Sequence, residues 1–292
     1  MLKHTSVKKL IKKAFNLVGL EIVNLNAYVK YKTVLTSTQS KKTELEYAFD
    51  RLTFIVRNGN YKKSSCFDSY DFLIYALDKL LVSKAQLFQD LFVLYCLNNK
   101  KNGFFIEFGA ADGVAYSNSL LLEKEYEWTG ILAEPALSWN AKLKENRDCF
   151  IDNRCVWSKS GEVLNFHETS IAEYSTVDRF TSSDANYGYR KTKKTYKVNS
   201  ITLNDLTKEY RAPFEIDYLS IDTEGSEFEI LDSFDFTSHN IKIITVEHNY
   251  TPNRERIFKL LSGKGYTRVF TSISLFDDWY VTDSIYEVLK RR

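Results

Sequence analysis

The sequence has 292 residues and a mass of 34.0 kDa, which suits one large domain or two modest ones. Apolar residues make up 44% and aromatic residues 15%, and the 11 Gly and 3 Pro exclude collagen-like and Gly/Pro-rich disordered chains. The net charge of +2 excludes a uniformly basic nucleic-acid-binding body, so we expect no nucleic-acid partner. The four cysteines form no CxxC pair and no secretory leader is visible, which indicates a reduced, cytoplasmic setting.

Residues 1–42 are the basic part of the chain, with nine Lys against one acidic residue and hence a net charge of +8. The apolar residues of 10–18 fall at helical spacing, which is typical of a basic amphipathic helix on a membrane surface. The alternative is a helix that packs on the protein's own body with its lysines in solvent. No apolar run is long enough for a spanning helix, so we expect a cytoplasmic protein, with peripheral contact at the inner membrane face as one alternative.

The chain changes character about a third of the way along. Residues 43–100 have a helical pattern, and the part from 70 to 98 is rich in Leu and Phe and lacks both Gly and Pro. Beyond it, short apolar runs alternate with helical patterns. We therefore predict a helical N-terminal extension over 1–100 and an α/β domain over 101–292. No signal in the sequence indicates the oligomeric state.

Short apolar runs bounded by polar or turn-forming residues predict the strands of this domain. Strands that alternate with helices imply a doubly wound, mostly parallel, seven-stranded sheet of the Rossmann type, with 161–167 as an extra strand. Ligands bind beyond the carboxyl ends of such strands, so the site is expected directly after residues 108, 134, 222 and 248. The predicted strands are 104–108, 130–135, 149–157, 161–167, 216–222, 241–248, 266–271 and 279–283, with helices over 136–146, 226–234 and 253–262.

The loop after the first strand is the most informative segment. It reads EFGAADG from Glu107 to Gly113 and lacks the GxGxxG fingerprint of dinucleotide-binding loops. Glycine there permits a tight turn and close backbone approach to a ligand, and the following helix start exposes N–H donors to an anionic group. A diphosphate has no use for a carboxylate at Glu107, whereas a cationic amino group does, as in the methionine part of S-adenosylmethionine.

Glu134 ends the second strand, 21 residues after Gly113. A carboxylate at this point accepts both ribose hydroxyls of a nucleoside cofactor, in NAD sites and in S-adenosylmethionine sites alike. The alternative is an exposed loop carboxylate without a ligand. Together, the acidic loop and Glu134 favour a nucleoside cofactor with a cationic arm.

Several segments resemble the FkbM-type S-adenosylmethionine-dependent methyltransferases and occur in the family's order. The resemblance covers roughly residues 100–285, and EFGAADG together with IDTEGSE is far more specific than either motif alone. It implies that residues 101–292 form an S-adenosylmethionine-binding domain with methyltransferase activity. The segments are FFIEFGAADGVAYSNSLLLEKEYEWTGILAEP (104–135), ENRDCFIDNRCVW (145–157), IDYLSIDTEGSEFEIL (216–231), IKIITVEHN (241–249) and the terminal FDDWYV (276–281).

The resemblance also implies where the cofactor is held. The loop from Glu107 to Gly113 would line the methionine end, Ser117 and Asn118 would hold its carboxylate, and Glu134 would bind the ribose. The stretch 152–155 would flank the adenine, with Cys155 interpreted as a small buried apolar residue. The implied cofactor-binding set is Glu107, Gly109, Ala110, Asp112, Gly113, Ser117, Asn118, Glu134, Asn153 and Asp222.

Methyl transfer from a sulfonium is an in-line displacement, so the enzyme must align the acceptor oxygen and remove its proton. Asp222 and Glu224 follow one strand, and Glu247 and His248 end the next. We predict His248 as the base, because its imidazole titrates near neutral pH, with Asp222 and Glu224 as further catalytic residues. The alternative is a divalent cation such as Mg²⁺ on Asp222, Glu247 and His248, which would lower the pKa of a bound hydroxyl.

Other polar residues have weaker contexts. His4, His167 and His239 are predicted to lie on the surface. Asp277 and Asp278 are assigned to a late loop beside Trp279, where they would either contact substrate or form a solvated acidic turn.

Methyltransferases of the FkbM type act on hydroxyls, often on sugars. The resemblance therefore implies a sugar or other hydroxyl-bearing acceptor, in a surface glycan or in its lipid-linked or nucleotide precursor. Segment 168–197 suits a carbohydrate because it is rich in aromatic and hydroxyl side chains, although an ordinary polar insertion has the same composition. Its named side chains are Tyr174, Tyr187, Tyr189, Arg190 and Tyr196.

Two other functions remain open at this point. A nicotinamide-dependent sugar oxidoreductase or epimerase requires the GxGxxG loop, which is absent, and a Tyr-x-x-x-Lys pair, whose spacing Tyr187 and Lys191 match. A non-catalytic module that kept the fold would have lost its cofactor acids. Those acids are all present: Glu107, Asp112, Glu134 and Asp222.

Overall fold

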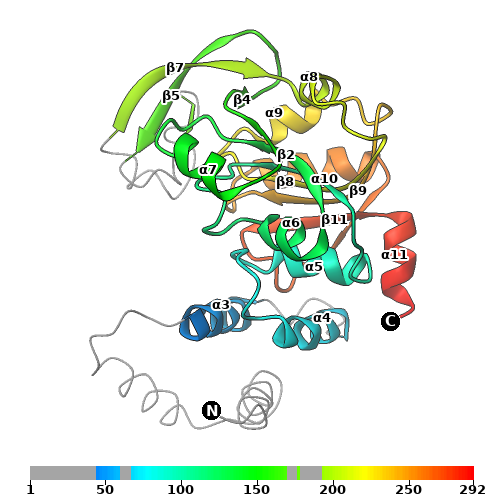
Figure 1. Cartoon of the computed structure of the whole chain (residues 1–292). Coiled ribbons are helices and arrows are strands. Elements are labelled where there is room, and N and C mark those ends of the chain that lie inside the picture. The colour runs from blue at the N-terminus through cyan, green and yellow to red at the C-terminus, as the bar shows by residue number, and fades with distance from the viewer. Residues whose placement is uncertain (1–43, 60–66, 170–175, 178–192) are drawn as a thin grey trace, which may run out of the picture. The chain divides into compact units, whose positions relative to one another are not determined.

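The computed structural model describes residues 44–59, 67–169, 176–177 and 193–292 (Figure 1). The chain divides into two compact units, residues 1–56 and 57–292. In the first unit, helix α3 (Glu44–Asn58) buries Ala48, Leu52 and Ile55, which share one face at helical spacing.

Some predictions concern residues outside the described part of the chain. The amphipathic helix and membrane contact of 1–42 lie there, as do His4 and most of segment 168–197. These stay predictions, and so does the domain boundary at residue 100. In the described residues, no helix is long and apolar enough to cross a membrane.

Residues 57–292 are built on a seven-stranded sheet with the order β10-β11-β9-β8-β1-β2-β3. Five neighbouring strands run parallel, and β11 lies antiparallel between β9 and β10. The chain winds from β1 to β3 on one side and from β8 to β9 on the other, so the switch point lies between β1 and β8. The predicted α/β class with a mostly parallel sheet is confirmed. The strands are β1 (Phe104–Phe108), β2 (Thr129–Ala133), β3 (Phe150–Asp152), β8 (Glu215–Ile221), β9 (Asn240–Glu247), β10 (Tyr266–Val269) and β11 (Asp277–Thr282).

A second, four-stranded sheet has the order β4-β7-β5-β6. The segment 149–157, predicted as one strand, is divided between the two sheets as β3 and β4. The chain turns between them because the backbone N–H of Arg154 donates to the Asp152 carboxylate (2.8 Å), which its guanidinium also pairs with. His167 was predicted to lie on the surface, but it is buried in β5, where its Nδ1 meets the Thr195 hydroxyl at 2.9 Å. The strands are β4 (Cys155–Val156), β5 (Val163–Thr169), β6 (Thr176–Val177) and β7 (Lys193–Ile201).

Alternation along the strands gives the large sheet two different faces. On one face, Ile106, Leu219 and Ile244 belong to an extensive apolar cluster that α8 (Leu203–Glu209), α9 (Glu227–Asp232) and α10 (Asn253–Gly263) cover. On the other face, the alternate positions Glu107, Ser220 and Thr245 are polar and buried. Figure 1 shows α5 (Gln89–Cys96) and α6 (Leu120–Tyr126) on the opposite side of the sheet from α8 and α9.

Helix α5 brings the Leu- and Phe-rich N-terminal segment into the core of this unit. All eight of its residues are buried, and the Phe92 ring stacks on Trp279 of β11 with the centroids 4.6 Å apart. Phe72 of α4 (Phe67–Asp78) meets both rings edge-on. The remaining helices are α7 (Asn140–Asn146) and α11 (Asp283–Lys290).

We expect Phe92→Ala to lower the free energy of unfolding by about 3–5 kcal/mol, because it leaves a cavity beside the Trp279 ring. Urea denaturation followed by tryptophan fluorescence measures the loss. The exposed Phe214 provides the control, since Phe214→Ala should change stability by less than about 0.5 kcal/mol. Equal losses in the two variants would contradict a core role for α5.

Candidate active site

The loop that follows β1 runs from Gly109 to Ser119 at the expected edge of the sheet. Gly109 and Gly113 have φ values of 76° and 79°, a region that glycine adopts readily. A Cβ on Gly109 would lie 1.9 Å from the carbonyl oxygen of Asp222, and one on Gly113 would lie 2.7 Å from Cγ of Arg147. The glycines therefore allow the loop to pack closely on the protein itself, directly against the end of β8.

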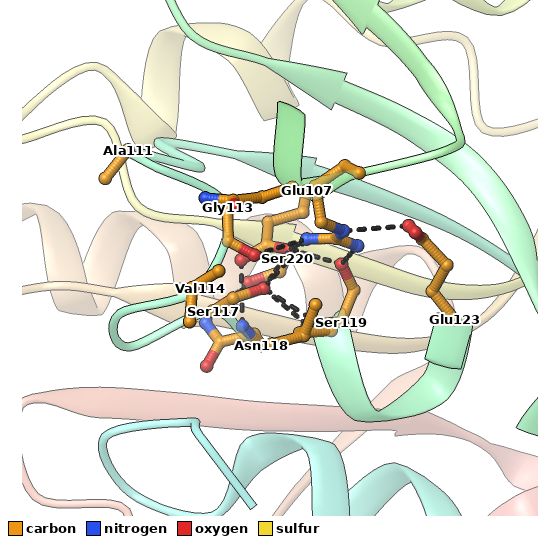
Figure 2. Close-up of polar contacts among 12 residues, drawn as sticks. Glu107, Ala111, Gly113, Val114, Ser117, Asn118, Ser119, Glu123 and Ser220 are labelled. Carbon is orange, nitrogen blue, oxygen red and sulfur yellow. Dashed lines mark hydrogen bonds and ion pairs between the residues drawn. The ribbon is translucent and has the colours of Figure 1, made fainter. Parts of the chain in front are cut away.

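Glu107 is buried beside this loop, with 3% of its surface exposed (Figure 2). One carboxylate oxygen accepts the backbone N–H of Asn118 (2.8 Å), and the other accepts the hydroxyls of Ser117 (3.1 Å) and Ser119. The carboxylate predicted for the methionine amino group is thus directed at the turn before α6. Direct contact between Glu107 and a cofactor stays a prediction.

Asp112 and Glu134 also accept backbone N–H groups. Together with Glu107, they occupy four N–H groups of the loop, whose donors were predicted to meet an anionic ligand. The loop is therefore organised around the protein's own carboxylates. The donors are Val114 and Ala115 for Asp112 (both 2.9 Å), Ala111 (2.9 Å) and Ala136 (2.7 Å) for Glu134, and Asn118 for Glu107.

The other predicted cofactor residues lie around the same edge. Ala110 and Ser117 are buried next to Glu107 in the loop. The Asn153 side-chain amide donates to Asn140 Oδ1 (2.6 Å) and to the Glu134 carbonyl (3.3 Å), which ties the β3–β4 turn to the start of α7. Cys155 is buried, as expected for a small apolar residue.

Asp222, Glu224 and Glu247 form a carboxylate cluster at the ends of β8 and β9. Their oxygens lie within 4.8 Å of one another. Burial, followed by the charge of Asp277, raises the pKa of Asp222 to about 7. Burial, followed by the charge of Asp222, holds the pKa of Glu247 well above its usual range. Carboxyl groups in this arrangement can share a proton near neutral pH or bind a cation.

Asp277 and Asp278 are not in a late loop or a solvated turn, because they begin strand β11 and are 4% and 1% exposed. β11 is antiparallel, so its first residues lie at the edge where the parallel strands end, and Asp277 pairs with Glu247 in register. The Gln89 amide of α5 donates to Asp277 Oδ2 (2.8 Å). Burial raises the pKa of Asp277 to about 7.

His248 follows Glu247, yet its hydrogen bonds lead elsewhere. Its Nδ1 accepts the backbone N–H of Tyr250 (3.0 Å), so the proton of the neutral ring is assigned to Nε2, which lies 3.7 Å from Asp278 Oδ1. Burial lowers the pKa of His248 to about 4. The structure thus groups Glu224, rather than His248, with Asp222 and Glu247.

Two buried residues near the site, Arg147 and Gln89, had no recognised role in the sequence. Arg147, at the end of α7, donates to the Gly113 carbonyl (3.1 Å), and Gln89 reaches Asp277 from α5. Arg147 stands in the family-like segment 145–157 but was given no role there, and Gln89 belongs to no motif. Only the fold brings the two residues to this edge. Asp277 did have a signal, because the alternation in FDDWYV places it on the same strand face as Trp279.

The chain matches the family model described as the methyltransferase FkbM domain over residues 107–282. This match spans more than half of the sequence. The chain belongs to the FkbM methyltransferase family. The family implies S-adenosylmethionine as the cofactor and confirms the resemblance noted from the motifs. No curated protein matches the chain.

Several solved structures are similar to this chain. A precorrin-6y C5,15-methyltransferase from Geobacter metallireducens GS-15 shares 10% identity, with 62% of this chain and 71% of that chain covered and a TM-score of 0.35. Methyltransferase FkbM from Methylobacillus flagellatus KT shares 9% identity, with coverages of 94% and 70% and a TM-score of 0.40. A chain of the fibrillarin/Nop5p complex shares 12% identity, with coverages of 62% and 71% and a TM-score of 0.31.

The residues of this FkbM methyltransferase fit S-adenosylmethionine in two respects. Oδ1 of Asn118 is buried and accepts no hydrogen bond in the described part of the chain, while its Nδ2 donates to the Ser220 hydroxyl (2.9 Å). A buried acceptor suits an ammonium group, whereas Asn118 was predicted to bind the carboxylate of the cofactor. Each Glu134 oxygen has more than one lone pair, so it can accept a ribose hydroxyl in addition to a backbone N–H.

We expect Gly109→Ala to be far more damaging than Gly161→Ala. Both glycines have positive φ, but a Cβ on Gly161 meets nothing within 4 Å, whereas one on Gly109 collides with the Asp222 carbonyl. Gly161→Ala should cost about 1–2 kcal/mol of stability, and Gly109→Ala more than about 3 kcal/mol together with loss of cofactor binding. Thermal melts and S-adenosylhomocysteine titrations measure both effects, and similar results for the two variants would refute the packing argument.

Proposed function

We propose that this protein is an S-adenosylmethionine-dependent O-methyltransferase whose acceptor is a sugar hydroxyl. The observation that carries the proposal is the contact between the loop after β1 (109–119), here called the cofactor loop, and the carboxylate cluster at the ends of β8 and β9. Gly109 packs on the Asp222 carbonyl, so the loop assigned to the cofactor adjoins carboxylates that can take a proton. S-adenosylmethionine supplies an activated methyl group, and the protein must align and deprotonate the acceptor.

The carboxylate pair of Asp222 and Glu247 is the base that the geometry favours. The two groups lie half-buried and side by side at one sheet edge. The charge of Asp222 raises the pKa of Glu247, whereas a hydrogen bond from Glu247 favours the ionised form of Asp222. A carboxyl group whose pKa is raised toward 7 is well suited to accept a hydroxyl proton at neutral pH. In this proposal His248 orients the Asn249–Tyr250 turn, in place of the predicted role as base.

The occupied loop amides favour the methyltransferase over the nicotinamide-dependent alternative. A diphosphate is held by N–H groups at a helix start, and four such groups in this loop are taken by carboxylates. Asp222 and Glu247 also speak against a non-catalytic module, because carboxyl groups with raised pKa values destabilise a fold at neutral pH.

A sugar is proposed as the acceptor because of an exposed aromatic ring at the site. Tyr250 is 66% exposed, and its ring meets the His248 ring edge-on with centroids 5.5 Å apart. An exposed ring beside carboxylates suits an acceptor with one apolar face and several hydroxyls. Tyr196, predicted as an acceptor residue, instead accepts the Leu137 N–H (2.9 Å) and donates to Glu168.

The proposed function is tested by titrating the protein with S-adenosylmethionine, S-adenosylhomocysteine and NAD. A panel of methyl glycosides and nucleotide sugars is then incubated with S-adenosylmethionine carrying a labelled methyl group. We expect binding of both sulfur compounds and acid-stable transfer of label to a sugar. Binding of NAD alone would refute the proposal, and transfer to an amine would refute the O-methyl assignment.

The variant His248→Gln separates the two candidate bases. A glutamine can accept the Tyr250 N–H and donate toward Asp278, but it cannot take a proton at neutral pH. We expect His248→Gln to keep turnover within about threefold, and Asp222→Asn to lower it by about a hundredfold or more. The production of S-adenosylhomocysteine measures both rates, and loss of turnover in His248→Gln would restore the imidazole as base.

The predicted divalent cation is the second way in which this cluster can activate a hydroxyl. The grouping of Asp222, Glu224 and Glu247 is the observation that favours it. Turnover that disappears with a chelator and returns with Mg²⁺ would support the cation, and turnover unchanged by the chelator would leave the carboxylate pair as base.

The raised pKa of Asp222 also predicts how stability depends on pH. In the folded chain this carboxyl group keeps its proton up to about pH 7, whereas in the unfolded chain it loses it near about pH 4. Its stabilising contribution is therefore present below pH 4 and is lost as the pH rises through 7.

We expect the stability of Asp222→Asn relative to the wild type to increase by about 1–3 kcal/mol when the pH is raised from 5 to 8. Denaturation in the presence of a chelator at both pH values measures this gain. The control is Asp235→Asn at an exposed carboxylate whose pKa is lowered by hydrogen bonds from Thr237. The stability of this variant relative to the wild type should not change over the same pH range. A stability difference that does not change with pH would contradict the raised pKa of Asp222.

A further inference from the structure

The end of helix α7 is joined to the cofactor loop by two neighbouring side chains. Nδ2 of Asn146 donates to the Asp112 carbonyl (2.8 Å), and Nη1 of Arg147 donates to the Gly113 carbonyl (3.1 Å). Helix α7 follows the strand end that carries Glu134. One short helix therefore links the ribose side of the proposed site with its methionine side.

Arg147 lies at the centre of a closed polar network. Its side chain is fully buried, and it donates to the carboxylate of Glu123 (2.8 Å) and to the hydroxyls of Ser117 (3.1 Å) and Ser119 (2.8 Å). Its Nη1 lies 3.9 Å from Glu107 Oε2. A buried guanidinium satisfied by several fixed acceptors resists rearrangement, because breaking any of these contacts leaves a buried charge without compensation.

The two serines connect Arg147 to Glu107. Figure 2 labels both serines and the glutamate. Each hydroxyl accepts from the guanidinium and donates to the carboxylate, so both of its hydrogen-bonding roles are assigned. The other Glu107 oxygen holds the backbone N–H of Asn118. The position of Asn118, whose Oδ1 suits the cofactor's ammonium group, thus depends on the Arg147–Glu107 network.

Packing provides a second link, independent of hydrogen bonding. The space where Gly113 would carry a Cβ is filled by the Arg147 stem and by Leu143 of the same helix, both at 2.7 Å. On another side, the guanidinium carbon lies 5.5 Å from the centre of the Phe105 ring in β1. Arg147 is held between the strand and the loop, so a shorter or uncharged side chain would leave the loop without support.

We propose that Arg147 is the positioning residue for the amino-acid arm of the cofactor. It acts through Ser117, Ser119 and Glu107 to fix the loop and the Asn118 side chain, and it does not touch the cofactor. Glu107 is then the internal partner of this arginine, in place of the direct ligand predicted from the sequence. The inference rests on the proposed S-adenosylmethionine-dependent function.

The test compares two thioethers that differ only in the amino-acid arm, S-adenosylhomocysteine and 5′-methylthioadenosine. Calorimetric titration of Arg147→Met should show about tenfold or greater weakening for S-adenosylhomocysteine, the equivalent of one lost charge-assisted hydrogen bond. Binding of 5′-methylthioadenosine should stay within about twofold, because Glu134 and its N–H donors are unchanged. Arg147→Lys keeps the positive charge but lacks the planar guanidinium with its several N–H donors, so it should recover part of the lost affinity.

Lys124→Met is the matched control. Lys124 also pairs with Glu123 (3.0 Å) but reaches outward to Asp148 (2.5 Å), so its removal should leave the affinities for both thioethers unchanged. If the Arg147 variants fail to fold, Ser117→Ala combined with Ser119→Ala breaks the same link with less disturbance and should show the same selective loss.

Equal weakening of the two thioethers would indicate general damage to the fold and would overturn the inference, as would unchanged affinity for S-adenosylhomocysteine. If the wild-type protein binds both thioethers and the variants give either of these two results, only the positioning role of Arg147 is refuted. A wild-type protein that binds neither thioether refutes the proposed function, and the inference with it.

Discussion

The structure depends on how carboxylates that are buried or half-buried at one edge of a parallel sheet are compensated. Removing an ionised carboxylate from water is costly, so each such group must find donors, find a cation or keep its proton. Glu107 and Glu134, beside β1 and β2, use backbone N–H groups and hydroxyls. Asp222 and Glu247, beside β8 and β9, lie against one another and have raised pKa values.

This difference divides the edge into two halves with different chemistry. Carboxylates that are fully hydrogen-bonded hold a loop in one shape, which suits the binding of a large cofactor. Carboxyl groups with raised pKa values can take up a proton at higher pH than usual, which suits the activation of a hydroxyl. Gly109 lies on the boundary, where a single missing Cβ allows the two halves to touch. In the proposed function, the switch point of the sheet is also the boundary between cofactor and acceptor.

Much of this arrangement was predictable from the sequence, because strand alternation and loop glycines are local signals. The parallel strands and the convergence of Asp222 with Glu247 followed from where apolar runs end. The hydrogen-bond partners of the side chains could not be predicted from the sequence. Glu107 has the same sequence context whether it faces a ligand or a serine, and the difference is made by Arg147, which lies 40 positions later. The hydrogen bond of His248 could not be foreseen for the same reason, since its Nδ1 partner depends on the backbone turn at Tyr250.

The packing of α5 sets a lower limit on the segment that can fold alone. The segment that matches the family model starts at residue 107, after this helix has ended. A chain cut at that point would expose the ring of Trp279 and leave Asp277 without the amide of Gln89. Removal of that much aromatic surface from the core exceeds what the marginal stability of a domain tolerates. The packed core of residues 57–292 therefore extends beyond the recognisable family segment and includes α5 and α4.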